Sequence, residues 1–94
     1  MREKVIEQKL VSEVKQRGGI CPKWVSPGFD GVPDRFVFLP GSHFGMVEVK
    51  APGKEPRPLQ VSRHRLFERL GFKVFVLDDL DQIPALLDEI ERSQ

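Results

Sequence analysis

The spacing of hydrophobic residues along the chain predicts three amphipathic helices. Apolar side chains recur every three or four positions in residues 3–17, 59–71 and 81–93. The first of these segments carries Ile6, Leu10 and Val14 on one side, and two glycines follow it, as is common where a helix ends. Pro84 falls in the first turn of the last segment, where proline is tolerated.

Shorter runs rich in β-branched and aromatic residues predict strands at residues 20–26, 34–39, 44–50 and 72–77. Pro22 indicates that the first strand is an edge strand or begins irregularly. The turn at residues 40–43 makes the second and third strands an antiparallel hairpin. The intervening helix makes the third and fourth strands a parallel pair. We therefore expect an α/β fold with a mixed sheet flanked by helices and a C-terminal helix.

The third predicted strand carries two charges in an otherwise apolar run, "GMVEVKAPG" at residues 45–53. Because side chains alternate along a strand, Glu48 and Lys50 share one face while Val47 and Val49 share the other. The charged pair is then either a solvated strand edge or part of a site.

Length and composition indicate a single small domain over residues 1–94. The 94 residues are 39% hydrophobic and 31% charged, which is typical of a globular protein. No apolar run reaches the roughly 18 residues that a membrane span requires, and the N-terminus lacks the apolar region of a secretory signal. The lone Cys21 cannot form an internal disulfide, so we expect an intracellular, reducing location in the cytoplasm.

Charge is distributed unevenly although the net charge is only +1. The stretch from Lys50 to Lys73 holds seven basic and two acidic residues, whereas residues 78–91 hold six acidic and no basic ones. A basic middle permits binding to a polyanion on one face. Ordinary solvated helix faces are the alternative explanation.

A carboxylate in each strand of the hairpin gives the charged pair a chemical context. Asp34 precedes Glu48 by 14 residues with a turn between them, so folding back brings the two together, with Gly31 and Pro33 shaping the turn that presents Asp34. Two carboxylates form an oxygen-rich site that suits Mg²⁺ or Mn²⁺. Lys50 on the same face can contact a scissile phosphate, and the metal can activate water for phosphodiester hydrolysis. The alternative is a surface ion pair and a turn-capping Asp34.

The combination "GVPDRFVFLPG…GMVEVKAPGKEPRPLQ" resembles the VRR-NUC (virus-type replication-repair nuclease) family of the PD-(D/E)xK nuclease superfamily, in its stand-alone phage type. The similarity runs from the first helix to the "GFKVFVL" strand and covers most of the chain. The resemblance implies a restriction-endonuclease-like αβββαβ core and metal-dependent cleavage of phosphodiester bonds in DNA.

Carried over to this sequence, the resemblance makes Asp34 and Glu48 metal ligands together with the main-chain carbonyl of Val49. It makes Lys50 the catalytic cation and Gln60 the glutamine that supports the phosphate or the lysine. The residues expected to bind DNA in the basic stretch are Lys54, Arg57, Arg63 and Arg65.

The family also supplies an acidic residue from the first helix. Glu7, which lies among the inward-facing apolar positions of that helix, is the expected metal ligand. Glu3, one turn earlier, is the alternative.

Five other side chains have two interpretations each. His43 and His64 are either general bases or histidines outside the chemistry, since metal-activated water makes a histidine base unnecessary. Cys21 is a small buried hydrophobe rather than a nucleophile. Trp24 belongs to the core or to a dimer contact, and Arg35 either faces the surface or contacts a phosphate.

The sequence therefore predicts a Mg²⁺- or Mn²⁺-dependent endodeoxyribonuclease that is phage- or prophage-encoded. The chain contains no element that reads bases, so selectivity comes from DNA shape, such as a four-way (Holliday) junction or other branched DNA cut by a homodimer. A helicase or another replication or repair protein is an expected partner. The alternative is a catalytically idle nucleic-acid-binding module that retains the nuclease fold.

Overall fold

The computed structural model describes residues 2–92, with three helices and a three-stranded sheet. The elements in chain order are α1 (Glu3–Gln16), β1 (Arg35–Leu39), β2 (His43–Val49), α2 (Pro58–Arg69), β3 (Val74–Leu77), a 3₁₀ turn (Leu80–Gln82) and α3 (Ile83–Arg92). The three predicted helices are confirmed. The last one is preceded by the 3₁₀ turn, and Pro84 is its second residue; its predicted final residue, 93, lies outside the described residues.

The sheet has the order β1-β2-β3 and mixed strand directions. β1 and β2 are antiparallel, with Arg35 opposite Val47, and β2 and β3 are parallel, with Val49 opposite Leu77. The crossover that parallel pairing requires is supplied by α2. The hairpin and the parallel pair are both confirmed, as is the α/β fold with a mixed sheet.

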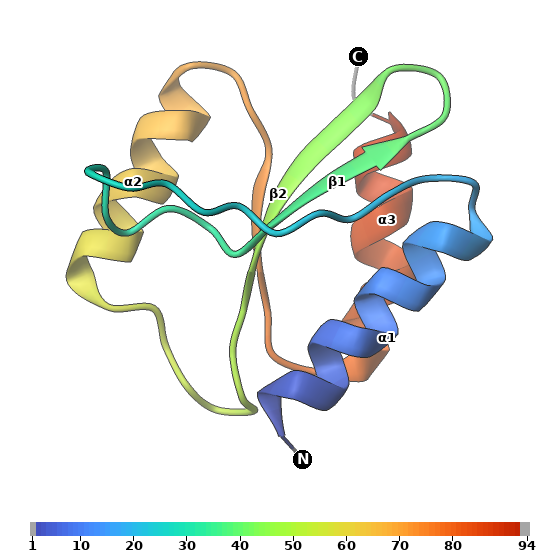
Figure 1. Cartoon of the computed structure of the whole chain (residues 1–94), viewed down its shortest axis with the longest axis horizontal. Helices are drawn as coiled ribbons and strands as arrows, with labels where there is room; N and C mark the ends of the chain where they lie inside the picture. The colour runs from blue at the N-terminus through green and yellow to red at the C-terminus, as the bar shows by residue number, and fades with distance from the viewer. Residues whose placement is uncertain (1, 93–94) are drawn as a thin grey trace.

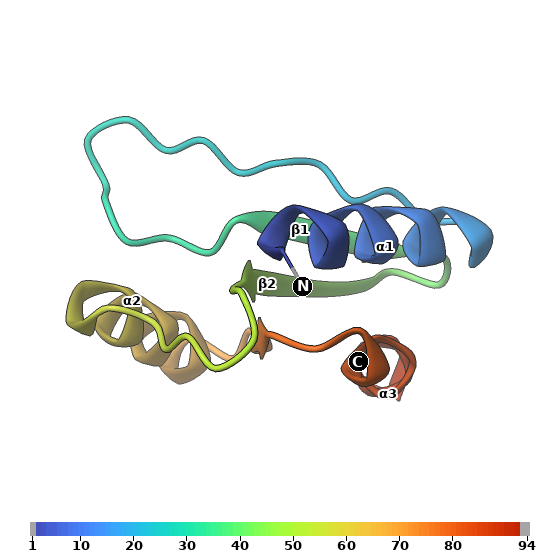
Figure 2. The same cartoon turned by 90° about the horizontal axis from the view of Figure 1, so that it is seen from below.

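The predicted strand at residues 20–26 is not a continuous strand. Only two isolated bridges connect this segment to β1, Ile20 with Phe38 and Lys23 with Arg35. Pro22 has no N–H to donate to a ladder, although its carbonyl accepts a hydrogen bond from the Phe36 N–H at 2.9 Å. The described chain therefore has three strands, and this segment runs beside β1 before it extends towards α2 (Figure 2).

The two faces of the sheet are covered by different helices. Figure 1 shows α2 on one side of the sheet and α1 with α3 on the other. Gly45 lies against α3 so closely that a Cβ there would be 2.7 Å from Ile90 Cδ1. Because side chains alternate, Val47 and Val49 point the same way as Gly45. The opposite face of β2, which includes Glu48, is directed to α2.

The apolar core fills the layer between the sheet and the α1–α3 pair. Its buried members are Ile6, Leu10, Val14, Cys21, Val37, Leu39, Val47, Val49, Leu77, Ile83, Leu86, Leu87 and Ile90. Burial of these side chains supplies the main driving force for folding. Within residues 2–92, no helix is long and apolar enough to cross a membrane.

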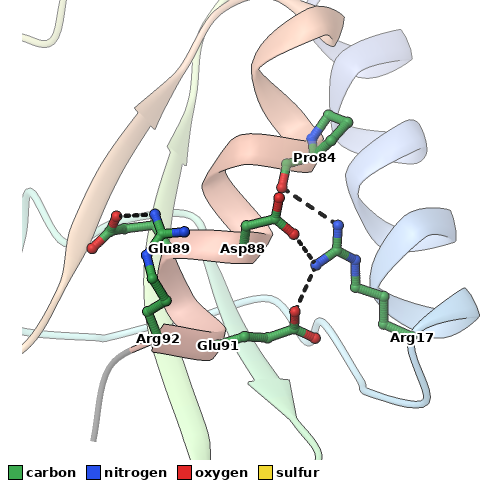
Figure 3. A network of polar contacts seen from close by, with 6 residues as sticks. All are labelled: Arg17, Pro84, Asp88, Glu89, Glu91 and Arg92. Carbon is green, nitrogen blue, oxygen red and sulfur yellow. Dashed lines mark hydrogen bonds and ion pairs between the residues drawn. The ribbon is translucent and has the colours of Figure 1, made fainter.

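Arg17 joins the end of α1 to α3 on the surface of this layer (Figure 3). Its Nη1 lies 2.8 Å from Asp88 Oδ1 and 2.9 Å from Glu91 Oε1, and its Nη2 donates to the Pro84 carbonyl at 3.4 Å. A guanidinium can serve several acceptors because its donors fan out in one plane. The contact links the two helices on the face of the sheet that lies away from α2.

Candidate active site

The loop before β1 is shaped to deliver Asp34 to the start of the strand. Gly31 has φ of +87°, and a Cβ on it would lie 2.8 Å from Leu59 Cγ, so a side chain is excluded there on two grounds. Pro33 is fully buried. Both observations agree with the expected role of these two residues in the turn.

Asp34 lies beside Glu48 because the ladder of the hairpin continues one step past Arg35 and Val47. The Asp34 N–H donates to the Val47 carbonyl at 3.0 Å. Asp34 Oδ2 accepts a hydrogen bond from the Val49 N–H at 2.8 Å. The expected convergence of the two carboxylates is therefore present in the structure.

The environment of Asp34 disfavours its charged form. Burial raises its pKa, the hydrogen bond from the Val49 N–H opposes that rise, and the neighbouring Glu48 and the charge of Glu3 add to it. The resulting pKa is about 6, compared with the ordinary value of 3.8. Two acids held this closely form a site that a cation would stabilise.

Glu48 is 1% exposed, so the interpretation of Glu48 and Lys50 as a solvated strand edge is wrong. Oε2 of Glu48 accepts a hydrogen bond from Gln60 Nε2 at 3.0 Å and lies 3.6 Å from Lys50 Nζ. Oε1 lies 3.6 Å from His64 Nε2. A buried carboxylate requires such compensation, because an unpaired charge in the interior is strongly unfavourable.

Gln60 is fixed in orientation by contacts at both ends of its amide. It lies at the third residue of α2, and its Oε1 accepts a hydrogen bond from the Arg57 N–H at 2.8 Å. The amide nitrogen is therefore directed at Glu48. The structure brings Gln60 to the carboxylate of Glu48.

Lys50 follows β2 directly and keeps its side chain at the rim of the site. Its N–H donates to the Leu77 carbonyl at 2.9 Å, which extends the parallel ladder by one residue. The side chain is 17% exposed, in contrast to the buried Glu48. The ammonium group can therefore reach both the buried acid and a bound anion.

His64 also contacts Glu48, a contact that the sequence did not predict. One interpretation of the sequence makes His64 a general base on the basic helix, but its side chain is buried against Glu48. Among residues 2–92, neither His64 Nε2 nor Glu48 Oε1 has a hydrogen-bond partner. The signal for this residue is its spacing of four from Gln60, which places both on one face of a helix.

Glu7, the acid of α1 expected to bind metal, is paired with Arg35. Its Oε2 lies 2.9 Å from Arg35 Nε, and Arg35 Nη1 donates to the Cys21 carbonyl at 2.8 Å. Arg35 is thus engaged by partners within the protein and is not a freely solvated surface residue. Between Glu7 and Glu3, it is Glu3 whose charge raises the pKa of Asp34.

The four basic residues expected to bind DNA lie in different environments. Lys54, Arg57 and Arg65 are exposed. Arg63 instead donates from Nε to the Asp30 carbonyl at 2.8 Å, with its guanidinium 4.0 Å from the centroid of a phenylalanine ring in the same loop. Arg65 lines a groove of about 510 Å³ on α2 together with Pro56, Pro58, Val61, Ser62 and Arg69.

The remaining side chains singled out in the sequence lie outside this cluster. His43 begins β2, at the opposite end of the strand from Glu48. Burial raises the pKa of the Cys21 thiol to about 11, which suits a buried hydrophobe better than a nucleophile. Trp24 stacks on Phe36 with ring centroids 4.7 Å apart.

The donor set fits a hard divalent cation in its chemistry. Asp34 and Glu48 offer carboxylate oxygens, and within the described part of the chain Glu48 Oε1 is a buried acceptor that receives no hydrogen bond. Over residues 2–92, no three His, Cys, Asp or Glu side chains form a ready group of metal ligands. A cation bound here would therefore depend on main-chain oxygen, water or substrate for its other ligands.

Comparisons with known proteins agree on a nuclease fold. No family model matches the chain. "Putative nuclease p44" of Acyrthosiphon pisum secondary endosymbiont phage 1 is 52% identical over 81 residues, which cover 86% of this chain and 87% of that protein. A solved structure described as "VRR_NUC domain" superposes with a TM-score of 0.86 and 28% identity, covering 94% of this chain and 97% of the other.

Proposed function

Because the chain belongs to the VRR-NUC family and is of its phage type, we propose that it is a metal-dependent endodeoxyribonuclease, formed by one domain over residues 1–94. A nuclease function is supported by the fold and by the name of its phage relative. Dependence on Mg²⁺ or Mn²⁺, and cleavage of DNA within the cytoplasm, are the finer parts of the proposal.

One observation carries this proposal. The buried carboxylate of Glu48 is contacted by Gln60, Lys50 and His64, while Asp34 joins it from the neighbouring strand. An acid pair with an adjacent lysine can hold a divalent cation and stabilise the charge that develops when a phosphodiester is hydrolysed. A purely structural ion pair would have no need of a second carboxylate, Asp34, whose pKa is raised by burial and by the neighbouring Glu48.

We assign the cation to Asp34, Glu48 and the Val49 carbonyl. A divalent cation bound there would supply Lewis acidity to the phosphodiester and to the attacking water. Glu3 replaces Glu7 as the acid that α1 contributes, because Arg35 pairs with Glu7 and the charge of Glu3 acts on Asp34.

Lys50 and Gln60 have separate roles in this proposal. Lys50, at the rim of the site, neutralises charge that develops on the phosphate. Gln60 holds Glu48 in place, and through its contact with Arg57 it couples the start of α2 to the site.

DNA binding is assigned to the exposed cations near the start of α2 and along its outer side. Lys54, Arg57 and Arg65 contact the phosphate backbone, whereas Arg63 supports the loop that leads to Asp34. Contacts of this kind position a duplex and carry no sequence information. Selectivity is then a matter of DNA shape, for which branched DNA such as a four-way junction is the proposed substrate and a homodimer the proposed active form.

The experiment that tests this proposal compares DNA shapes with and without metal. Purified protein is incubated with Mg²⁺, Mn²⁺ or EDTA and with labelled four-way junction, flap, splayed-arm, linear duplex or single-stranded DNA. Metal-dependent cleavage that favours branched DNA is the expected result. Equal cleavage of junction and linear duplex would overturn the selectivity. Binding without cleavage would favour the idle module, and light scattering that finds monomer alone would overturn the homodimer.

A recruiting helicase or repair protein is a separate partner to be sought by co-purification.

A further inference from the structure

Two buried polar atoms face each other at the site without a hydrogen bond. Glu48 Oε1 and His64 Nε2 are 3.6 Å apart, and neither has a hydrogen-bond partner among the described residues. The separation exceeds that of an ordinary N–H···O bond, which is close to 3 Å. Unsatisfied polar atoms are rare in protein interiors, and a facing pair at a site is best explained by a function.

The backbone explains why these two atoms meet. Gln60 and His64 lie four residues apart on the buried face of α2, so their side chains stack one turn apart. Gln60 holds Oε2 of Glu48, and His64 is directed at Oε1. One helix face therefore brackets both oxygens of a single carboxylate.

We propose that His64 is a positioning residue, which orients the Glu48 carboxylate through the approach of its Nε2 to Oε1, 3.6 Å away, while Gln60 holds Oε2 by a hydrogen bond. The proposal rests on the proposed function, since it takes Glu48 as a ligand of the divalent cation. Partners that orient a ligating carboxylate typically change metal affinity or activity by about 10–100-fold when they are removed. The groups that face His64 from the strand opposite include Glu48 and, on the other oxygen of that carboxylate, Lys50.

The geometry argues against two other roles for His64. A general base must reach solvent or substrate, but this side chain is only 10% exposed and its Nε2 is fully buried. A purely space-filling role would be met by an apolar residue of similar volume, which would bury no unsatisfied nitrogen beside Glu48. The substitution of an apolar residue therefore separates positioning from packing.

The test uses the full chain with His64→Leu and His64→Gln, and with His43→Leu as the matched histidine control. Leucine removes the N–H and keeps much of the volume, while the glutamine amide offers an N–H near the position of Nε2. Binding of Mn²⁺ alone is measured by calorimetry, thermal unfolding with and without Mn²⁺ gives a second readout, and cleavage kinetics give kcat and KM.

We expect His64→Leu to weaken Mn²⁺ binding by about tenfold or more and to lower kcat more than it raises KM. His64→Gln should recover most of both, and His43→Leu should match the wild type. Unchanged Mn²⁺ binding in folded His64→Leu would overturn the inference, as would equal impairment of the two His64 variants. If His64→Leu does not fold, the test uses His64→Gln alone. The inference requires this variant to bind Mn²⁺ nearly as the wild type does, and clearly weaker binding would overturn it.

The outcomes separate this inference from the proposed function. Loss of Mn²⁺ binding in His64→Leu, in a wild type that binds Mn²⁺ but cuts no DNA, supports the positioning role and contradicts the nuclease. Cleavage that requires Asp34 but is unaffected by His64→Leu supports the nuclease and contradicts the positioning role.

Discussion

Gln60 donates a hydrogen bond from Nε2 to Oε2 of Glu48 across 3.0 Å, and this contact ties the first turn of α2 to the central strand. Both residues are almost fully buried, Gln60 at 6% and Glu48 at 1% exposure. The other end of the same amide accepts the Arg57 N–H. A single side chain therefore satisfies a buried carboxylate and an N–H that precedes the helix. Gln60 thus contributes both to the folded state and to the position of Glu48 in the site.

Replacing Gln60 should reveal this double role in the stability of the protein. Gln60→Leu removes both contacts and leaves Glu48 with fewer donors, so we expect the free energy of unfolding to fall by about 1–3 kcal/mol. Urea denaturation of the metal-free protein measures this change. A variant as stable as the wild type would show that the hydrogen bond to Glu48 contributes little to the folded state.

The raised pKa of Asp34 predicts a pH dependence with a definite sign. The folded state binds the Asp34 proton more tightly than the unfolded state, because its pKa is about 6 when folded and 3.8 ordinarily. The free energy of unfolding should therefore fall as pH rises through that window. Allowing for partial solvent screening, the loss attributable to Asp34 is about 1–2 kcal/mol.

Asp34→Asn isolates this effect, because an amide oxygen can still accept from the Val49 N–H but carries no charge. Urea unfolding of both metal-free proteins at about pH 4 and about pH 7 measures the difference. The advantage of the variant should grow between the two pH values. A constant difference would contradict the assigned pKa.

Two arginines two positions apart should behave differently when they are replaced. Arg63 binds the Asp30 carbonyl and covers the Phe29 ring, so Arg63→Ala should destabilise the protein by about 1 kcal/mol and slow cleavage by loosening the approach to Asp34. Arg65→Ala should leave stability unchanged and weaken DNA binding. Urea unfolding and the salt dependence of DNA binding measure the two effects.

The salt dependence distinguishes the two roles more sharply than affinity alone. Loss of one phosphate contact in Arg65→Ala should reduce the slope of log affinity against log salt by about 1. An unchanged slope in Arg65→Ala, or a stability loss equal to that of Arg63→Ala, would contradict the assignment.

The sequence predicted most of the fold because strand and helix periods were clear. Asp34 and Glu48 could be paired from the length of the turn between them, since a hairpin register follows from alternation. The segment at residues 20–26 was mistaken for a strand because its Ile, Trp and Val have high β-propensity. Pro22 instead limits it to isolated bridges with β1.

The parts of the site that could not be predicted depend on how elements rotate against one another. Glu7 follows the inward-facing Ile6, yet Arg35 pairs with it, and a salt bridge across 28 positions leaves no local signal. His64 has a visible spacing from Gln60, but its burial depends on the packing of α2 against the sheet. The same holds for Arg63, whose partners lie about thirty positions away along the chain.

The most direct test of the account is metal-dependent cleavage by Lys50→Ala. The lysine touches Glu48 from the rim of the site and is assigned to the phosphate, so its loss should lower the rate of DNA cleavage by about 100-fold or more. Single-turnover assays with Mn²⁺ and a labelled four-way junction measure that rate, and calorimetry checks that Mn²⁺ still binds. We predict lost cleavage with retained Mn²⁺ binding. Cleavage at the wild-type rate would contradict the assignment of the active site to Asp34, Glu48 and Lys50.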